Sequence, residues 1–289
     1  MIRQTMPGVH AREIQEVLKP GDPGYWFHPE WDKAFPWLAQ GTTGRRKSEA
    51  GRIRNFARFT DPPARGARHS WAALASQVDF PKVAHSRQVH GKSVTVYDRL
   101  EGSGEWEELV EASENDPHGP LTGEGRMVLG PDADGHITAS EGVLLGVTVA
   151  DCVPISVVDP EKRVVAMLHA GWKGTAVGVL DRGVRLLGEE FGSRAEDLHI
   201  HLGPAICGEC YEVGPEVHAA LGLPSDSGPS PVDLRYFLAS RAVEIGIVDA
   251  KLTRSAWCTL CGDSPFFSHR RGDQGRQVGF VGIRPSGDS

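Results

Sequence analysis

The sequence predicts a layered fold of the α+β or α/β class, built on a mixed β-sheet. Three apolar runs, at residues 143–149, 153–159 and 163–169, follow one another with only turn or proline positions between them, as buried strands do. Segments with helical spacing of apolar residues are interleaved with further strand-like runs. Because short strand-to-strand turns and strand-to-helix connections both occur, we expect a mixed sheet covered by helices.

The first half of the chain gives weaker signals. Residues 20–45 mix proline, glycine and tryptophan, which predicts an irregular segment anchored by aromatic side chains. The basic stretch at 42–66 indicates a solvated loop or a short pair of strands, because phosphate binding requires a more sustained basic face. Alternating β-branched residues predict a strand at 93–97. The acidic, glycine-rich stretch that follows has few core residues and predicts an exposed insertion loop over 99–131.

The second half of the chain predicts its elements more clearly. A helix is expected over 175–191, where Gly192 suits the C-terminal end. Asp233 can cap a second helix that runs to about Ile245. Two further strands are expected, at 199–202 and 277–283. The apolar face of the first helix is predicted to consist of Val177, Leu180, Val184 and Leu187.

Composition excludes several classes of protein. Hydrophobic residues make up 39% of the chain and charged residues 24%, which is typical of a globular protein with a substantial core. No apolar run reaches the roughly 18 residues of a membrane span, and the N-terminus lacks the pattern of a signal peptide, so we expect a cytoplasmic protein without a membrane partner. The net charge of −7 and the absence of a dense basic block argue against nucleic acid as a partner.

Three residues stand out because each lies where a strand gives way to a turn: His90, Cys152 and His169. Two imidazoles and one thiolate form a soft set of three ligands, and three protein ligands leave the fourth tetrahedral position open, as in catalytic zinc sites. These residues are scattered along the chain, and no short motif joins them. Two histidines with satisfied hydrogen bonds and a buried thiol remain the alternative.

Five blocks of the sequence, in order, resemble the signatures of the bacterial laccase-domain family, also called the polyphenol oxidase or peptidoglycan-editing-factor family. The blocks are QVHG, GVTVADCVPISVVDP, VVAMLHAGWKGTAVGVL, GPAICGECYEVGPEV and FFSHRRGDQGR. The resemblance runs from about residue 83 to 283, whereas residues 1–80 match only faintly, through GTTGR and Asn55. It implies a single domain over 1–289, with an α+β fold in which helices flank a layered, mixed β-sandwich core.

The resemblance also implies a metal site and a set of activities. By motif, the zinc ligands correspond to His90, Cys152 and His169. Family members are described as phosphorylases of purine nucleosides, including adenosine, inosine and methylthioadenosine, and as adenosine deaminases. Some are described as hydrolases that edit a peptidoglycan precursor. An older description is copper-dependent phenol oxidation.

The residues themselves weigh against copper. Laccase chemistry needs several copper centres and therefore many clustered histidines, but the only His-X-His pair is His199 and His201, which we expect at a solvated sheet edge. Zinc with an open position suits deamination, because the pKa of a bound water falls. The predicted cofactor is therefore zinc, and the predicted partners are a purine nucleoside and phosphate.

Phosphorolysis also needs an anion site and groups around the reacting sugar. Lys173 is expected to open the 175–191 helix, whose N-terminal amides attract anions. It stands where the family usually has arginine, so it keeps the charge and loses the bidentate fork. Asp151 can orient a neighbour or act as an acid or base, and Asp134 matches a family aspartate expected in a turn or beside a ligand. The remaining candidates for substrate or phosphate binding are Asn55, Arg270, Arg271 and Arg276, for which surface ion pairs are the alternative.

A second mechanism stays open. Cys152 and His169 could be a nucleophile and a base, as in a cysteine hydrolase. The family's fold is shared with a toxin deamidase that uses such a pair. Metal occupancy discriminates between the two, because a thiolate bound to zinc is not free to attack. The predicted catalytic set for either reaction is Cys152, His169, Lys173 and Asp151.

Four other cysteines form two CxxC pairs, Cys207 with Cys210 and Cys258 with Cys261. Two such pairs are a strong signal for a structural zinc ion. Buried thiols that lie near one another, or a redox-labile disulfide, are the alternatives. Three tryptophans near the N-terminus are expected to be core anchors and not part of a cofactor site: Trp26, Trp31 and Trp37.

Overall fold

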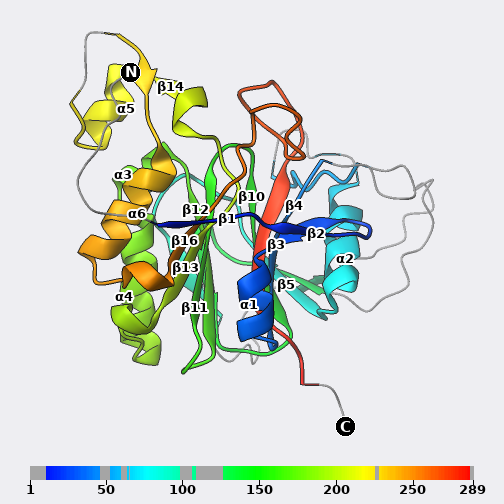
Figure 1. Cartoon of the computed structure of the whole chain (residues 1–289). Coiled ribbons are helices and arrows are strands. Elements are labelled where there is room, and N and C mark those ends of the chain that lie inside the picture. Colours follow the sequence, from blue (N-terminus) through cyan, green and yellow to red (C-terminus); the bar gives the residue numbers. More distant parts are fainter. Residues whose placement is uncertain are drawn as a thin grey trace.

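Two large β-sheets pack face to face, and helices cover the outer face of each (Figure 1). The architecture comes from a computed structural model, which describes residues 11–45, 53–59, 64, 66–97, 106–108, 126–224 and 228–286. A layered, mixed β-sandwich flanked by helices is therefore confirmed.

The first sheet has seven strands in the order β1-β16-β13-β11-β12-β9-β6. Its centre is antiparallel, because β11 pairs with β12 on one side and with β13 on the other. Both margins are parallel, since β13 pairs with β16 and β9 with β6 in that sense. The strands are β1 (Arg12–Ile14), β6 (Val94–Val96), β9 (Gly135–Thr138), β11 (Val153–Asp159), β12 (Val164–Ala170), β13 (His199–Leu202) and β16 (Leu252–Ser255).

The second sheet has eight strands in the order β2-β3-β4-β17-β10-β5-β8-β7. The strands expected at 143–149 and 277–283 are β10 and β17, which pair antiparallel at its centre. Its strands are β2 (Val17–Lys19), β3 (Tyr25–Phe27), β4 (Leu38–Thr43), β5 (Lys82–His85), β7 (Trp106–Glu108), β8 (Arg126–Leu129), β10 (Val143–Val149) and β17 (Gln277–Ile283).

Helices α4 and α6 pack on the seven-stranded sheet, and α2 packs on the eight-stranded sheet (Figure 1). As expected, Asp233 caps α6, where its carboxylate accepts the N–H of Tyr236. In the described part of the chain, no helix has the length and apolar content to span a bilayer. The α-helices are α1 (Pro29–Ala34), α2 (Ala67–Val78), α3 (Trp172–Ala176), α4 (Val179–Phe191), α5 (Pro215–Ala220) and α6 (Leu234–Glu244). Three 3₁₀ turns, η1 (Ala195–Asp197), η2 (Gly208–Cys210) and η3 (Asp249–Lys251), and a small sheet of β14 (Glu212–Val213) and β15 (Ser230–Pro231) complete the elements.

The central strands read as continuous apolar runs because both of their faces are buried. In β12, Ala166 and Leu168 face the helices, whereas Val165 and Met167 lie in the core between the two sheets. This alternation follows the two-residue period of a strand. It also places the next residue of the second set, His169, near the end of β12 on the face toward the other sheet.

The expectation of an irregular segment at 20–45 was wrong. This segment forms β3, α1 and β4, and β4 lies beside β17 in the sheet. The anchor role is confirmed for Trp26 and Trp31, which are buried, while Trp37 is only partly buried. Pairing with β17, more than two hundred positions away, stabilises β4, and no local pattern reports such a partner.

The expected helix at 175–191 is interrupted. A one-turn helix, α3, ends at Ala176, and α4 begins after Gly178, whose φ of +81° is left-handed. Val177 is 48% exposed and does not belong to the apolar face, whereas Leu180 and Leu187 are buried as predicted. Lys173 therefore lies in a helix of five residues and not at the start of a long one.

The stretches 42–66 and 99–131, both expected to be loops, differ from each other in secondary structure. Residues 53–59 contain neither helix nor strand, but Phe56 and Ala57 are buried, so the expectation of a solvated loop was wrong here. Residues 46–52, 60–63 and 65 lie outside the described residues. Within 99–131, in contrast, β7 and β8 extend the edge of the eight-stranded sheet, and Met127 of β8 is fully buried against α2 and its neighbours. The remainder of this stretch, except residues 130 and 131, lies outside the described residues.

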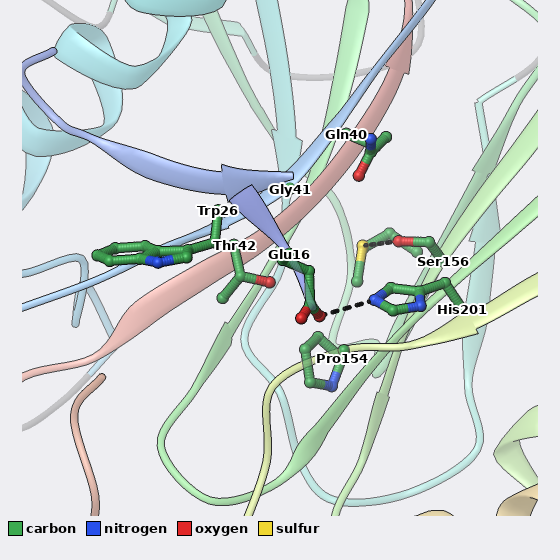
Figure 2. Close-up of a pocket in the computed structure, with 10 residues that line it drawn as sticks. Glu16, Trp26, Gln40, Gly41, Thr42, Pro154, Ser156 and His201 are labelled. Atoms are coloured by element: carbon green, nitrogen blue, oxygen red, sulfur yellow. Dashed lines mark hydrogen bonds and ion pairs between the residues drawn. The ribbon is translucent and has the colours of Figure 1, made fainter. Parts of the chain in front are cut away.

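The expectation that His199 and His201 lie at a solvated sheet edge was wrong, because β13 is an interior strand. His201 is buried, and its Nδ1 atom lies 3.0 Å from Thr253 Oγ1. Its Nε2 atom lies 3.0 Å from Glu16 Oε1 (Figure 2). Beside this pair is a cavity of about 10 Å³, which has room for roughly one water molecule and none for a nucleoside.

We predict that β8 contributes to the core although it lies within the expected insertion. Met127→Ala should lower the free energy of unfolding by about 2–5 kcal/mol, because a fully buried side chain leaves a cavity. Val248→Ala, at a residue that is 44% exposed, should change it by less than about 0.5 kcal/mol. Denaturant unfolding measures both, and an equal effect of the two substitutions would contradict a core role for β8.

Candidate metal centre and active site

The structure brings His90, Cys152 and His169 together. One ligand atom from each lies within 4.8 Å of the others, and the two imidazole centroids are 4.9 Å apart at 78°. The pairing of β11 with β12 sets this arrangement: Val153 lies opposite Ala170, so Cys152 and His169 reach the same end of the sheet. Zinc and copper both accept this donor set, and three ligands leave a coordination position for a further molecule.

Gly171 makes room for the cluster. A Cβ atom at this position would lie 2.9 Å from Cys152 Sγ and 3.3 Å from His90 Cδ2. Any side chain would therefore push two of the three ligands apart. The glycine after His169 in the HAGW block is explained by this close approach and not by its backbone conformation, since its φ is −80°.

Asp134 fixes the loop that carries His90. Its buried carboxylate accepts the backbone N–H groups of His90 at 2.9 Å, Gly91 at 2.7 Å and Val89 at 3.3 Å. These bonds hold His90 at a φ of +59°, a left-handed conformation that non-glycine residues adopt at a cost. The expectation that Asp134 supports a ligand therefore has a direct geometric basis.

Asp134 also fixes the orientation of His169. The Nδ1 atom of His169 lies 2.9 Å from Asp134 Oδ1, so Nε2 is the nitrogen left to face the cluster. Burial alone favours the protonated carboxyl, but the hydrogen bonds from His169, Gly91 and His90 outweigh it and hold the pKa of Asp134 below its usual range. A carboxylate that orients a ligating imidazole in this way is common in metal sites.

Cys152 and His169 strongly shift each other's pKa. Burial by itself raises the pKa of the Cys152 thiol, yet the positive charge of His169 and hydrogen bonds from both histidines lower it to about 6. Burial lowers the pKa of His169, but the Cys152 thiolate and Asp134 raise it to about 9. A thiolate beside an imidazolium is therefore the favoured state near neutral pH, ready either to bind a metal or to act as a nucleophile.

Asp151 connects the cluster to the long loop between β16 and β17. Its φ is +83°, and its buried carboxylate accepts Thr259 Oγ1–H at 2.6 Å and the Arg270 backbone N–H at 2.8 Å. Because each carboxylate oxygen holds a different part of the loop between β16 and β17, the geometry favours an orienting role over acid–base work. Asp151 thus positions the rim of the site, while its neighbour Cys152 belongs to the cluster of potential ligands.

Two of the candidate cations are exposed at this rim. Lys173 is exposed in α3, with its ammonium 5.4 Å from the centroid of the Trp172 ring. Arg270 is exposed, and its guanidinium lies 5.0 Å above the ring of Tyr211. Both side chains can reach solvent, so both are available to an anion.

The other candidates are engaged within the protein. The guanidinium of Arg271 bonds to Asp273 and to the carbonyls of Phe266 and Thr259. Arg276 donates to two neighbouring carbonyls. The Oδ1 atom of Asn55 accepts the Arg276 backbone N–H at 3.0 Å and so ties the first half of the chain to this loop. These contacts shape the FFSHRR block from within.

Three residues near the cluster were not predicted from the sequence. Tyr211 follows Cys210 directly, and burial together with the charge of Cys152 raises its pKa to about 12. Thr259 joins Asp151 to the second CxxC pair. Gln88 binds the backbone of Thr148 through both ends of its amide and anchors the His90 loop to β10. Tyr211 and Gln88 lie inside the motif blocks, and Thr259 lies between the cysteines of the second CxxC pair, so these motifs were the available signals.

The four remaining cysteines also converge. One sulfur atom from each of the four lies within 4.8 Å of the others. Over the described residues, these cysteines and the His–Cys–His set are the two groups of three or more potential ligands that come together. A group rich in histidine, as several copper centres would require, is absent from this part of the chain. The four are Cys207, Cys210, Cys258 and Cys261.

Comparison with known proteins places the chain among its relatives. A family profile described as "Multi-copper polyphenol oxidoreductase laccase" matches residues 54–284. The chain belongs to this family. A purine nucleoside phosphorylase of Streptomyces griseus, ORF3, is 31% identical over 76% of this chain and 82% of its own length. An adenosine deaminase of an unknown prokaryote, RL5, is 30% identical over 69% of this chain and 73% of its own length.

The family fold is also seen in a solved relative. The purine nucleoside phosphorylase YlmD of Geobacillus stearothermophilus is 36% identical over 53% of this chain, and the match spans 61% of that protein. Its crystal structure covers 93% of this chain and 100% of its own, with a TM-score of 0.74 and 26% identity. The family's layered fold therefore extends over nearly all of the chain.

We predict that Asp134 controls metal affinity without being a ligand. Asp134→Ala should weaken metal binding roughly 10- to 100-fold, because both histidines lose the group that orients them. Asp132→Ala is the matched control, since Asp132 is a nearby exposed carboxylate that pairs with Arg87. Competition with a chelator measures both variants, and equal affinities would show that the cluster forms without the buried carboxylate.

Proposed function

We propose that the chain is a zinc-dependent purine nucleoside phosphorylase that also deaminates adenosine and cleaves methylthioadenosine. The observation that supports this most directly is the cluster of His90, Cys152 and His169, with Asp134 holding two of the three ligands. Relatives named purine nucleoside phosphorylase and adenosine deaminase share the family. When bound, zinc would supply a Lewis acid and lower the pKa of a water molecule.

Zinc is favoured over copper by the kinds of ligand present. In the described residues the histidine-containing cluster is single, and the other cluster consists of thiols alone. Oxidation by several copper centres would need histidines at each of them. A tetrahedral ion without redox chemistry suits two imidazoles, one thiolate and an open position.

The residues of the chain would divide the remaining work. Lys173 and Arg270 would hold phosphate, because both are exposed cations on segments that border the cluster. In phosphorolysis a phosphate oxygen bonds to the sugar carbon while the bond from that carbon to the base breaks, so fixed positive charge beside the sugar keeps the nucleophile in place. Tyr211 and Trp172 would offer aromatic faces to the purine.

A hydrolase that uses Cys152 as a nucleophile is the second candidate. The specific observation that favours it is the mutual pKa shift of Cys152 and His169, to about 6 and about 9. Such a pair can attack an amide or an amidine carbon without a metal. The substrate class would then be a peptidoglycan precursor, in line with the editing role that the family resemblance implies.

We predict that Cys152→Ala lowers zinc occupancy together with activity. A thiolate contributes much of the affinity of such a site, and two histidines alone should hold zinc weakly. Elemental analysis gives the occupancy. Incubation with adenosine and phosphate gives the products: adenine with ribose 1-phosphate for phosphorolysis, and inosine for deamination. Loss of activity with full metal retained at this site would identify Cys152 as the nucleophile and refute the zinc assignment.

We predict that the rim cations act on phosphate. Lys173→Ala and Arg270→Ala should each raise the apparent KM for phosphate roughly tenfold, because a charged hydrogen bond to the anion is lost in a partly solvated site. Deamination of adenosine at saturating substrate should change less. Lys162→Ala is the matched control, since Lys162 is exposed at the opposite end of the β11–β12 hairpin.

Arg271 separates a binding role from a structural one. Arg271→Ala should lower the melting temperature and leave the apparent KM for phosphate nearly unchanged. The reason is that its guanidinium is bonded to Asp273 and two carbonyls. If Lys173→Ala slows both reactions equally, the residue positions the nucleoside or the metal loop instead. Wild-type activity that is independent of phosphate would refute the phosphorylase assignment and favour the hydrolase.

A further inference from the structure

We propose that Cys207, Cys210, Cys258 and Cys261 bind a second zinc ion with a structural role. This site is distinct from the His–Cys–His cluster and does not depend on the proposed function. Its ligands come from two segments, the loop with η2 after β13 and the loop after β16. Neither segment has a long helix or strand of its own to hold it in place.

The distances between the sulfur atoms match a mononuclear tetrahedral site. Zinc–sulfur bonds of about 2.3 Å place the sulfur atoms of an ideal tetrahedron about 3.8 Å apart. Cys207 Sγ lies 3.7 Å from Cys261 Sγ, and Cys210 Sγ lies 3.3 Å from Cys261 Sγ. All four sulfurs are within 4.8 Å of one another, so only small adjustments would complete the tetrahedron.

Backbone amides already point at one of the sulfurs. Cys258 Sγ accepts the N–H of Cys207 at 3.3 Å, of Leu260 at 3.4 Å and of Cys261 at 3.4 Å. N–H groups directed at a sulfur stabilise a thiolate more than a thiol, because the acceptor carries the charge. The two residues between Cys258 and Cys261 thus wrap around the sulfur as a chelating turn.

Disulfides and iron–sulfur clusters fit the positions of the four sulfurs less well than a single zinc ion does. A disulfide needs sulfurs about 2.05 Å apart. The four cysteines are free thiols, and the separations of Cys261 Sγ from Cys207 Sγ and Cys210 Sγ are 3.7 and 3.3 Å. A cluster of several irons would hold the four cysteine sulfurs further apart than they lie here. Tetrahedral coordination by four thiolates indicates zinc or iron–sulfur chemistry. The close spacing of the four sulfurs favours a single ion over a cluster of several irons.

The ion would fasten the rim of the candidate active site. Thr259 donates its N–H to the carbonyl of Ala205 at 3.1 Å, and its hydroxyl donates to Asp151 at 2.6 Å. Tyr211 follows the ligand Cys210 directly. One metal ion would therefore hold together the two loops that present Tyr211 and Thr259 to the residues around Cys152.

The test is a count of metal ions in the purified, reduced chain. Elemental analysis should find two zinc ions per wild-type chain, one in Cys261→Ser, one in Cys152→Ala and none in the double variant. Glu209→Ala, at an exposed position between Cys207 and Cys210, is the matched control and should keep two. Cys207→Ser should behave as Cys261→Ser and serves if that variant does not fold.

Two further readouts separate a structural ion from an inert one. Cobalt substituted into Cys152→Ala should show the intense visible absorption of a tetrathiolate centre, which the added Cys261→Ser change should abolish. A chelator should lower the melting temperature of Cys152→Ala by several degrees and leave that of the double variant unchanged. Unaltered metal content in both Cys207→Ser and Cys261→Ser, or iron in place of zinc, would overturn the proposal.

Discussion

The buried carboxylate of Asp134 is the contact on which the geometry of the candidate centre depends. It accepts three successive backbone N–H groups from the loop of His90 and the Nδ1–H of His169, while its own carbonyl accepts the His169 backbone N–H at 2.7 Å. Removing such an acceptor from a buried network leaves several donors without partners, and each costs about 1–3 kcal/mol. The loop, the imidazole orientation and the position of β12 are therefore coupled through one side chain.

The same logic explains two strained backbone positions beside the ligands. His90 and Asp151 both have positive φ values, of 59° and 83°, which cost about 1–3 kcal/mol each in non-glycine residues. Both positions lie where a strand or loop must turn sharply to aim a ligand at the cluster. Hydrogen bonds to a buried carboxylate offset the strain at each position. The backbone N–H of His90 donates to Asp134, and the carboxylate of Asp151 accepts from Thr259 and Arg270 in the loop between β16 and β17.

The sequence predicted those elements whose patterns lie within the element itself. The strands from β10 to β12 and the helix α6 were predicted because their apolar period and their caps lie within the elements themselves. The elements within 20–45 were missed, because Gln40 and His28 bond to each other and β4 pairs with β17, partners that no local pattern reveals. The burial of His201 depends in the same way on Glu16, which is distant in sequence. For the site, motif blocks brought the three ligands into view, but Arg271 was read by its charge, and the structure shows that this charge is committed to Asp273.

The two sulfur-containing clusters are linked by a hydrogen bond, and this bears on the substrate specificity of the proposed function. Asp151 precedes Cys152 and binds Thr259, which lies between the cysteines of the second CxxC pair. Changes to either cluster would therefore shift the same rim, where Arg270 and Tyr211 lie in contact. Under the proposed function, these rim side chains would bear on the choice among nucleosides. A rim fastened by its own metal ion could hold a defined shape without long helices or strands to support it, since four strong bonds would replace the packing that such short loops cannot provide.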